Sequence, residues 1–243
     1  MFQKLAKKLR GKTELCAVLL AGGCGSRMQT EQTKQFLHIL GVPIVVRSLL
    51  ALQRCDEVKS IVIVARLEEL DEYPPLLRRY GIDKVTKIVP GGSTRQRSAM
   101  QGLRAAPRGT THIAIHDAAR CLITPQQIHA VALDAYLYGA AAAACPAKDT
   151  VKLTDAGGFV KSTTDRAKTW LVATPQIFRI EQYRAAAYVA KEEGFEATDD
   201  AALLEHCSFP VKLTDCGYEN IKITTKEDLA VAAALLKKRE EGR

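Results

Sequence analysis

The sequence predicts an α/β fold with a doubly wound, mostly parallel sheet and a protruding β-hairpin arm. Short apolar segments that are typical of buried strands alternate with helical patterns along most of the chain. The first of these segments leads directly into a glycine-rich turn. Residues 147–168 interrupt the alternation, because strand-like segments there flank a turn with two glycines. In sheets of this kind ligands bind beyond the carboxyl ends of the strands, so the functional residues are expected at that edge.

Length and composition are those of one domain spanning residues 1–243. Hydrophobic residues make up 47% of the chain and charged residues 26%, and no apolar run is long enough to cross a membrane. Residues 1–13 form a basic N-terminal extension without the apolar core of a signal peptide. Seven cysteines without a C-x-x-C pair predict reduced thiols in a cytoplasmic protein rather than a zinc site or a disulfide framework.

The net charge of +8 is carried partly by the two ends of the chain. Basic ends can bind nucleic acid or anionic lipid, but no aromatic residues are interleaved with these charges. We therefore expect solvated ends, no membrane or nucleic-acid partner, and an anionic small-molecule substrate for the remaining cations.

The first part of the chain is predicted to alternate regularly. Residues 15–19 are short, apolar and partly β-branched, which predicts a buried strand. A helix is expected to begin near Pro43, because proline is favoured in the first helical turn. Residues 67–80 are predicted to be helical with a break at Pro74-Pro75. Further strands are expected at residues 60–65, 87–90, 112–116 and 140–146, and further helices up to about residue 106 and behind Thr124-Pro125, an N-cap followed by proline.

The second part contains the arm and then resumes the α/β pattern. Residues 149–153 and 159–163 are predicted to form a hairpin. A two-stranded hairpin is marginally stable by itself, so we expect it to pack on a second subunit of a homodimer. The later elements expected are strands at 170–174, 211–213 and 221–223, helical patterns at 180–193 and 199–207, and a last helix capped by Thr225 and Asp228.

The glycine-rich turn after the first strand indicates a cradle for a nucleoside triphosphate. Gly22, Gly23 and Gly25 allow positive φ and close backbone approach, and Arg27 and Lys34 add positive charge. The spacing excludes a P-loop and a dinucleotide fingerprint, since neither Gly-Lys-Ser/Thr nor a third glycine follows. An ordinary strand-to-helix turn with two solvated cations is the alternative.

The remaining candidate residues are cations, hydroxyls and one aspartate rather than bases. No Ser-His-Asp order, G-x-S-x-G elbow or Cys-His signature is present. His116 and Asp117 are adjacent on a strand, so their side chains point to opposite faces and are not expected to form a dyad. Such a set suits phosphoryl or nucleotidyl transfer. If the nucleophile is a phosphate monoester, its second pKa of about 6 leaves it anionic without a general base. Mg²⁺ or another divalent cation is expected, held mainly by the triphosphate.

Nine motifs occur in order between about residues 16 and 236: LAGGCGSRM, Lys34-Gln35, GGSTRQRS, HDAAR, KDTVK, TDR, ATPQIF, TDDAALLE and NIKITTKEDL. Together they resemble the 2-C-methyl-D-erythritol 4-phosphate cytidylyltransferases of the non-mevalonate isoprenoid pathway. The resemblance implies a Rossmann-like nucleotidyltransferase that joins CTP to methylerythritol phosphate and releases diphosphate. It also implies a homodimer in which the arm reaches into the neighbouring subunit.

The resemblance assigns three sets of residues. Arg27 and Lys34 resemble the catalytic pair that stabilises the pentacoordinate α-phosphate. The positions that resemble the family's CTP contacts are Ala21, Gly22, Gly23, Gly25, Gly92, Ser93 and Ser98. The positions that resemble its contacts to the acceptor, to ribose or to phosphate are Asp117, Arg120, Thr150, Arg166, Thr174, Thr198 and Lys222.

Four positions depart from the family pattern, and they leave the acceptor open. Cys121 stands where proline is usual, Ala173 replaces a common glutamine, Asp200 stands where glutamate is frequent, and Ser93 where some members carry an acid. A ribitol-5-phosphate cytidylyltransferase would share the fold and the loop. The acceptor polyol distinguishes the two.

Three other classes of protein are weighed against the enzyme. A non-catalytic CTP-binding module is disfavoured because binding alone does not need both Arg27 and Lys34. A basic nucleic-acid binder would be retained on heparin at physiological salt. An NAD-dependent dehydrogenase is disfavoured by Met28 in place of the third glycine, and by Arg66 where an acidic ribose ligand is expected.

Overall fold

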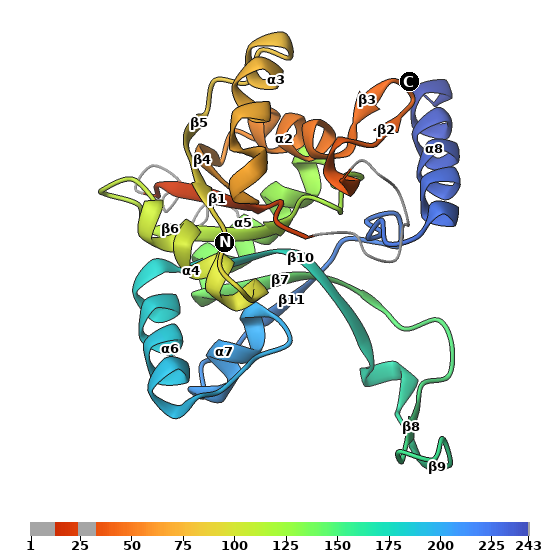
Figure 1. Ribbon diagram of the computed structural model, residues 1–243. Coiled ribbons are helices and arrows are strands. Elements are labelled where there is room, and N and C mark those ends of the chain that lie inside the picture. Colours follow the sequence, from red (N-terminus) through yellow and green to blue (C-terminus); the bar gives the residue numbers. More distant parts are fainter. Residues whose placement is uncertain (1–12, 24–32, 243) are drawn as a thin grey trace.

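A seven-stranded sheet forms the centre of the protein. The structure, a computed structural model, describes residues 13–23 and 33–242 (Figure 1). The order of the strands across the sheet is β11-β7-β10-β6-β1-β4-β5. Their bounds are β1 Leu15–Leu20, β4 Val58–Ala65, β5 Val85–Pro90, β6 His112–Asp117, β7 Ala140–Pro146, β10 Trp170–Arg179 and β11 Lys212–Asp215.

Six of the seven strands run in one direction, and β10 is reversed. β10 pairs antiparallel with both β6 and β7, whereas the other neighbouring pairs are parallel. β7 runs out to the arm and β10 returns from it, and strands joined without a crossover helix are antiparallel. The prediction of a mostly parallel sheet is confirmed, and the strand predicted at residues 170–174 extends to Arg179.

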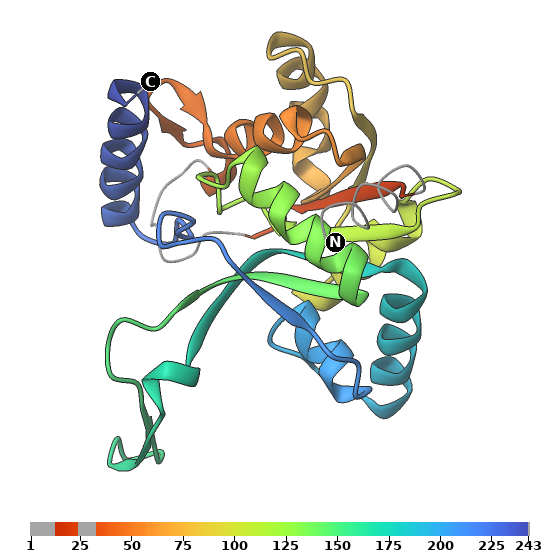
Figure 2. The same cartoon turned by 180° about the vertical axis from the view of Figure 1, so that it is seen from behind.

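Helices cover both faces of the sheet, as the prediction of a doubly wound fold requires. Successive residues of β1 point to opposite faces, so Leu15 and Leu19 pack with α2, α3 and α5 while Val18 packs with α4, α6 and α7. Figure 2 shows α5 crossing the face opposite to α4. The helices are α2 Ile44–Arg54, α3 Tyr73–Arg79, α4 Arg95–Ala105, α5 Pro125–Tyr138, α6 Ile180–Glu193, α7 Asp200–His206 and α8 Lys226–Glu241. None of the helices in the described residues has the length and apolar character needed to span a bilayer.

Local signals define the ends of several elements as predicted. Thr124 and Gln127 form a capping box at α5, and Thr225 and Asp228 form one at α8. Residues 67–80 divide at the two prolines into the 3₁₀ helix η3 (Leu67–Glu72) and α3. Short elements absent from the prediction are β2 His38–Ile39, β3 Val42–Pro43, η2 Lys34–Phe36 and η4 Arg166–Lys168.

The strand predicted at residues 221–223 is wrong. This segment is extended but does not join a sheet; Ile223 donates one backbone hydrogen bond, of 2.8 Å, to the carbonyl of Ala119. It runs past the turn that follows β6 rather than along a strand, so no ladder can form. The crossing instead brings Lys222 to the end of β6.

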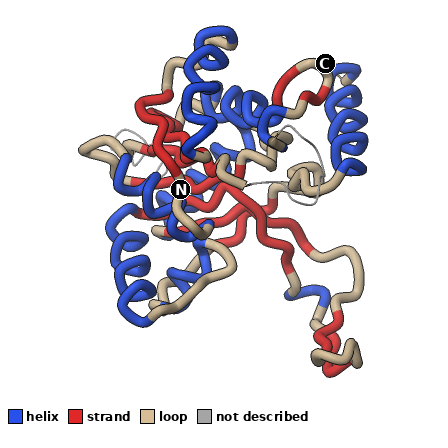
Figure 3. Tube along the Cα trace, viewed as in Figure 1, coloured by secondary structure: helices blue, strands red, loops and turns tan. Residues whose placement is uncertain are grey.

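The arm protrudes from the body of the protein and contains the predicted hairpin (Figures 1 and 3). Its strands, β8 (Lys152–Thr154) and β9 (Val160–Thr163), are antiparallel, and all their residues are exposed. The Asp155 carboxylate closes the turn by accepting hydrogen bonds from the N–H groups of Gly157 and Phe159 at 2.9 and 3.0 Å. The hairpin is therefore held by its own turn and ladder and not by a core.

Candidate active site

A cavity of about 390 Å³ opens at the carboxyl edge of the sheet, where β1 and β6 end and α4 begins. Its volume lies in the range of small-molecule sites. The predicted site residues that line it are Gly22, Gly23, Lys34, Gly92, Ser93, Ser98, Asp117 and Lys222. Residues separated by up to 200 positions therefore meet at the edge that the fold class predicts.

Asp117, the last residue of β6, is held between two cations. Nη2 of Arg95 lies 3.3 Å from Oδ1 of the carboxylate, and Nζ of Lys222 lies 2.8 Å from Oδ2. Burial raises the pKa of this carboxyl, but Arg95 and Lys222 outweigh burial and lower its pKa to about 2. Asp117 is therefore ionised at neutral pH, and each of its oxygens already has a cation of the protein beside it.

Arg95, which is not among the site residues predicted from the sequence, links Asp117 to a second buried carboxylate. Its Nη1 donates to Oδ2 of Asp200 at 2.6 Å, and the Tyr183 hydroxyl donates to Oδ1 of Asp200 at 2.6 Å. Burial disfavours the charged guanidinium, but Asp200 and Asp117 outweigh it and raise the pKa of Arg95. We call Arg95, Asp117, Tyr183, Asp200 and Lys222 the Asp117 centre. It joins β6 to α4, α6, α7 and the segment before α8.

One sequence signal could have identified Arg95. It is the first residue of α4, whose first turn contains no acidic residue. A cation at that position opposes the helix dipole. Such an unfavourable placement indicates that the side chain has a partner in another element.

Lys34 lies at the cavity beside the glycine turn. It begins η2, and its side chain is largely buried. The Gly23 carbonyl accepts a hydrogen bond from Nε2 of Gln35 at 3.3 Å, which ties the turn to η2. The backbone N–H of Ala21 already donates to Val64 at 2.7 Å, so it is not available to a ligand. The predicted residues Gly25 and Arg27 lie outside the described residues.

Residues 91–94 form the loop before α4, and residues 95–98 form the first turn of the helix. Thr94 caps the helix by accepting from the N–H of Arg97 at 3.1 Å. The Ser98 hydroxyl accepts from the N–H of Gly92 at 3.0 Å and donates to the Thr94 carbonyl at 2.9 Å. A Cβ at Gly92 would lie 2.4 Å from that of Arg97, so only glycine fits. The N-terminal end of α4, the positive end of the helix dipole, thereby borders the cavity.

Arg120 and Thr174 lie next to the cavity without lining it. Arg120 lines a smaller cavity of about 240 Å³ with residues of β7 and β10, and its Nη1 donates to the carbonyl of Asn220 at 2.9 Å. Its buried Nε has no hydrogen-bond partner among the described residues. The buried Thr174 hydroxyl accepts from the N–H of Asp117 at 3.0 Å and lies 3.0 Å from Nδ1 of His116. Thr174 thus fixes the position of Asp117.

Three predicted residues do not meet the others within one chain. Thr150 and Arg166 are exposed on the arm, and Thr198 is exposed in the turn before α7. None of the three lines the cavity at the carboxyl edge. In the described part of the chain, no group of three or more His, Cys, Asp or Glu residues is placed to hold a metal ion.

The mostly parallel sheet and the cation-lined cavity at its carboxyl edge are those of an α/β nucleotidyltransferase. A family model, described as 2-C-methyl-D-erythritol 4-phosphate cytidylyltransferase, matches residues 15–238. The chain belongs to this family.

Individual relatives agree with the family model. The 2-C-methyl-D-erythritol 4-phosphate cytidylyltransferase of Pelotomaculum thermopropionicum is 46% identical over 93% of this chain and 96% of its own. The enzyme of the same name from Geobacillus kaustophilus is 41% identical over 92% and 97% of the two chains. The crystal structure of 4-diphosphocytidyl-2C-methyl-D-erythritol synthase from Anaerococcus prevotii superposes with a TM-score of 0.85 at 27% identity, covering 95% of this chain and 99% of that chain.

Proposed function

We propose that this protein transfers CMP from CTP to 2-C-methyl-D-erythritol 4-phosphate and releases diphosphate. The observation that carries the proposal is the cavity at the carboxyl edge, which gathers Lys34, Lys222 and the first turn of α4. These groups favour a polyanionic ligand. The similarity to relatives that are named for this activity supports the choice of substrates.

The proposed reaction needs no general base, and the two candidate bases in the described part of the site are not suited to neutral pH. With a pKa of about 2, Asp117 is too weak a base to accept a proton from a hydroxyl. His116 is fully buried, and burial lowers its pKa to about 4. A phosphate monoester is already anionic at neutral pH and can attack the α-phosphate of CTP directly, with diphosphate as the leaving group.

In this mechanism the protein holds two anions together and stabilises the charge that develops on the α-phosphate. Gly22, Gly23 and the start of α4 bind the triphosphate. Ser93, in the loop before α4, and Ser98, in the first turn of this helix, take part in this binding. Lys34, together with Arg27, stabilises the pentacoordinate α-phosphate. Lys222 and Arg120 contribute to the binding of the phosphates of the two substrates.

Asp117 and Thr174 form a positioning pair in this proposal. Thr174 holds the backbone of Asp117, and Asp117 in turn holds Lys222 at 2.8 Å. The carboxylate thereby places the ammonium group of Lys222 beside the cavity.

Mg²⁺ or another divalent cation is proposed to enter with CTP. The polar side chains at the cavity are mainly cations and hydroxyls, and the Asp117 carboxylate is already paired with Arg95 and Lys222. This set suits an ion whose ligands are triphosphate oxygens and water. When bound, the ion would neutralise part of the charge of the diphosphate leaving group.

A cytoplasmic homodimer joined through the arm completes the proposal. The arm exposes Leu153, Phe159 and Val160, and a hairpin of two strands is rarely stable alone. Packing the arm on a second subunit would bury these side chains. It would also carry Thr150 and Arg166 toward the neighbouring cavity.

The experiment that tests the proposed function is diphosphate release from CTP and Mg²⁺ with methylerythritol 4-phosphate or ribitol 5-phosphate. Turnover with methylerythritol 4-phosphate is expected. Turnover with ribitol 5-phosphate alone would keep the class of reaction and overturn the acceptor. The absence of diphosphate release with either acceptor, in folded protein that still binds CTP, would identify a non-catalytic CTP-binding module.

A further inference from the structure

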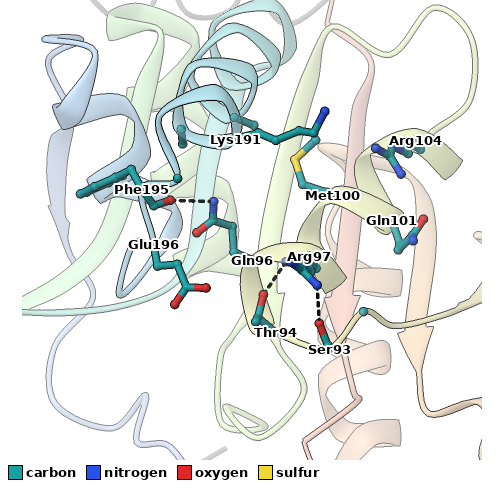
Figure 4. A pocket seen from close by; sticks show the side chains of 14 residues that line it. Ser93, Thr94, Gln96, Arg97, Met100, Gln101, Arg104, Lys191, Phe195 and Glu196 are labelled. Carbon is teal, nitrogen blue, oxygen red and sulfur yellow. Dashed lines mark hydrogen bonds between the residues drawn. The ribbon is translucent and has the colours of Figure 1, made fainter.

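A second cavity, of about 530 Å³, lies between α4 and α6 and shares the loop before α4 with the cavity at the carboxyl edge. Figure 4 shows it from close by. We call it the α4–α6 groove. Gly92, Ser93 and Thr94 line both this groove and the cavity at the carboxyl edge. A ligand in the groove would therefore touch the same loop as a ligand in the cavity at the carboxyl edge.

The groove combines an apolar body with cations. Met100 and Phe195 supply apolar surface, and the buried Ala187 and Ala190 of α6 leave room between the helices. The charged residues that line it are Arg97, Arg104, Lys191 and Glu196. Three cations against one carboxylate favour an anionic ligand, and the apolar surface favours a ligand with a hydrocarbon part.

The wall of the groove is held in place without a ligand. The Gln96 side chain donates to the Phe195 carbonyl at 3.3 Å and accepts from the N–H of Ala197 at 3.1 Å. The Phe195 ring stacks on His206 with 4.1 Å between ring centroids. A site formed in advance lowers the entropic cost of binding.

Two of the three cations are available for a ligand. Within the described residues, the Arg104 guanidinium has no hydrogen bond or ion pair, and the exposed Lys191 has only a contact of 3.7 Å to Glu192. An exposed pair of this kind contributes little. Arg97 differs, because its Nη1 donates to the Ser93 hydroxyl at 2.8 Å (Figure 4).

We propose that the α4–α6 groove binds an alkyl or aryl phosphate, and that the bound phosphate weakens CTP binding by drawing Arg97 away from Ser93. The apolar part lies on Met100 and Phe195, and the phosphate lies among Arg97, Arg104 and Lys191. Gly92 is in close contact with Arg97, so a shift of Arg97 also moves the turn that contains Gly92. The binding half stands on the groove alone, whereas the coupling half rests on the proposed CTP site.

The test uses hexyl phosphate as the probe and isothermal titration calorimetry on the full chain. We expect saturable binding of hexyl phosphate, and much weaker binding of inorganic phosphate and of hexanol, which each carry half of the recognised chemistry. The double variant Arg104→Glu/Lys191→Glu should weaken hexyl phosphate binding at least tenfold, the scale of lost charge-assisted hydrogen bonds. Arg184→Glu, an exposed charge reversal on α6 outside the groove, should leave binding within about twofold.

The coupling is read from the dissociation constant of CTP and not from turnover. Saturating hexyl phosphate should weaken CTP binding about fivefold in the parent protein and not in the double variant, and CTP should weaken hexyl phosphate by the same factor. Absence of saturable binding, or binding unaffected by the double variant, would overturn the site. Mutually exclusive binding of hexyl phosphate and CTP would place hexyl phosphate in the cavity at the carboxyl edge, and it would also overturn the proposed site in the α4–α6 groove. Unchanged CTP affinity would overturn the coupling. A failed turnover assay would affect only the proposed function.

Discussion

Asp117 has a cation beside each carboxylate oxygen, whereas Phe159 on the arm is 76% exposed. The Asp117 centre draws its members from β6, three helices and the segment before α8, and its two carboxylates are buried. The hairpin of the arm is held by its own ladder and turn. One region is completed by long-range contacts within a single chain, and the other is complete only as a local hairpin.

This difference indicates where each region obtains its stability. Buried charges are tolerated only when they are paired, so the Asp117 centre depends on the whole fold being in place. The arm exposes apolar side chains that a single chain leaves in water, and the proposed homodimer would bury them. The proposed active site uses both regions.

The largest expected effect is on kcat, and it concerns Lys34 in the cavity at the carboxyl edge. Lys34→Ala should lower kcat by about two to four orders of magnitude, the scale of losing a charge that stabilises the transition state. Arg27→Ala should have an effect of the same size. Diphosphate release under saturating CTP and acceptor measures both. Lys87→Ala, at an exposed position of β5 away from the cavity and the arm, serves as the control and should retain turnover.

Turnover close to the parent value in Lys34→Ala would remove the assigned mechanism. The stabilisation of the α-phosphate would then have to come from groups other than Lys34.

The second effect tests the stability of the two regions with one type of substitution. Arg95→Ala leaves the Asp117 and Asp200 carboxylates buried without their shared cation, so it should lower the free energy of unfolding by about 3–5 kcal/mol. Arg166→Ala on the arm should change it by less than about 0.5 kcal/mol. Urea denaturation of the three proteins measures the contrast, and equal losses in the two variants would contradict it.

The third prediction tests whether the arm completes the neighbouring site. Lys34→Ala and Arg166→Ala chains are each expected to be poorly active. Mixed chains should regain roughly a quarter of the parent activity, because half of the dimers are mixed and each has one intact site. Activity after confirmed subunit exchange is the measurement. No recovery would mean that each site is built within one chain.

Local sequence signals predicted what depends on neighbouring residues. The caps at Thr124 and Thr225 and the hairpin turn at Asp155 each involve residues two to four positions apart, and all were placed correctly. The carboxyl edge as the place of the cavity followed from the fold class. The resemblance to a family supplied individual residues such as Lys222, which the strand pattern around it would have assigned to a sheet.

Long-range contacts were not predictable in the same way. Arg95 and Asp200 are 105 residues apart, and no periodicity relates them. β10 is reversed because the arm joins it to β7 without a crossover helix. This depends on how the chain runs between the two strands and not on the residues of either strand. The sequence therefore predicted the elements of both regions but not the charge network that joins those of the Asp117 centre.

The smallest effect concerns His116, which precedes Asp117 on β6 and is fully buried. Burial lowers its pKa from 6.5 to about 4, so the folded state disfavours its protonation. The unfolded chain takes up the proton as the pH falls below 6.5, and stability present above that pH is lost progressively toward pH 4. Between pH 6.5 and 5 this one side chain should remove about 2 kcal/mol of unfolding free energy. His116→Gln, which cannot titrate, should reduce the pH dependence measured by urea denaturation by that amount. An unchanged pH dependence in His116→Gln would show that the core beneath the Asp117 centre admits a charge as readily as the exposed surface does, and the contrast between the two regions would fail at that point.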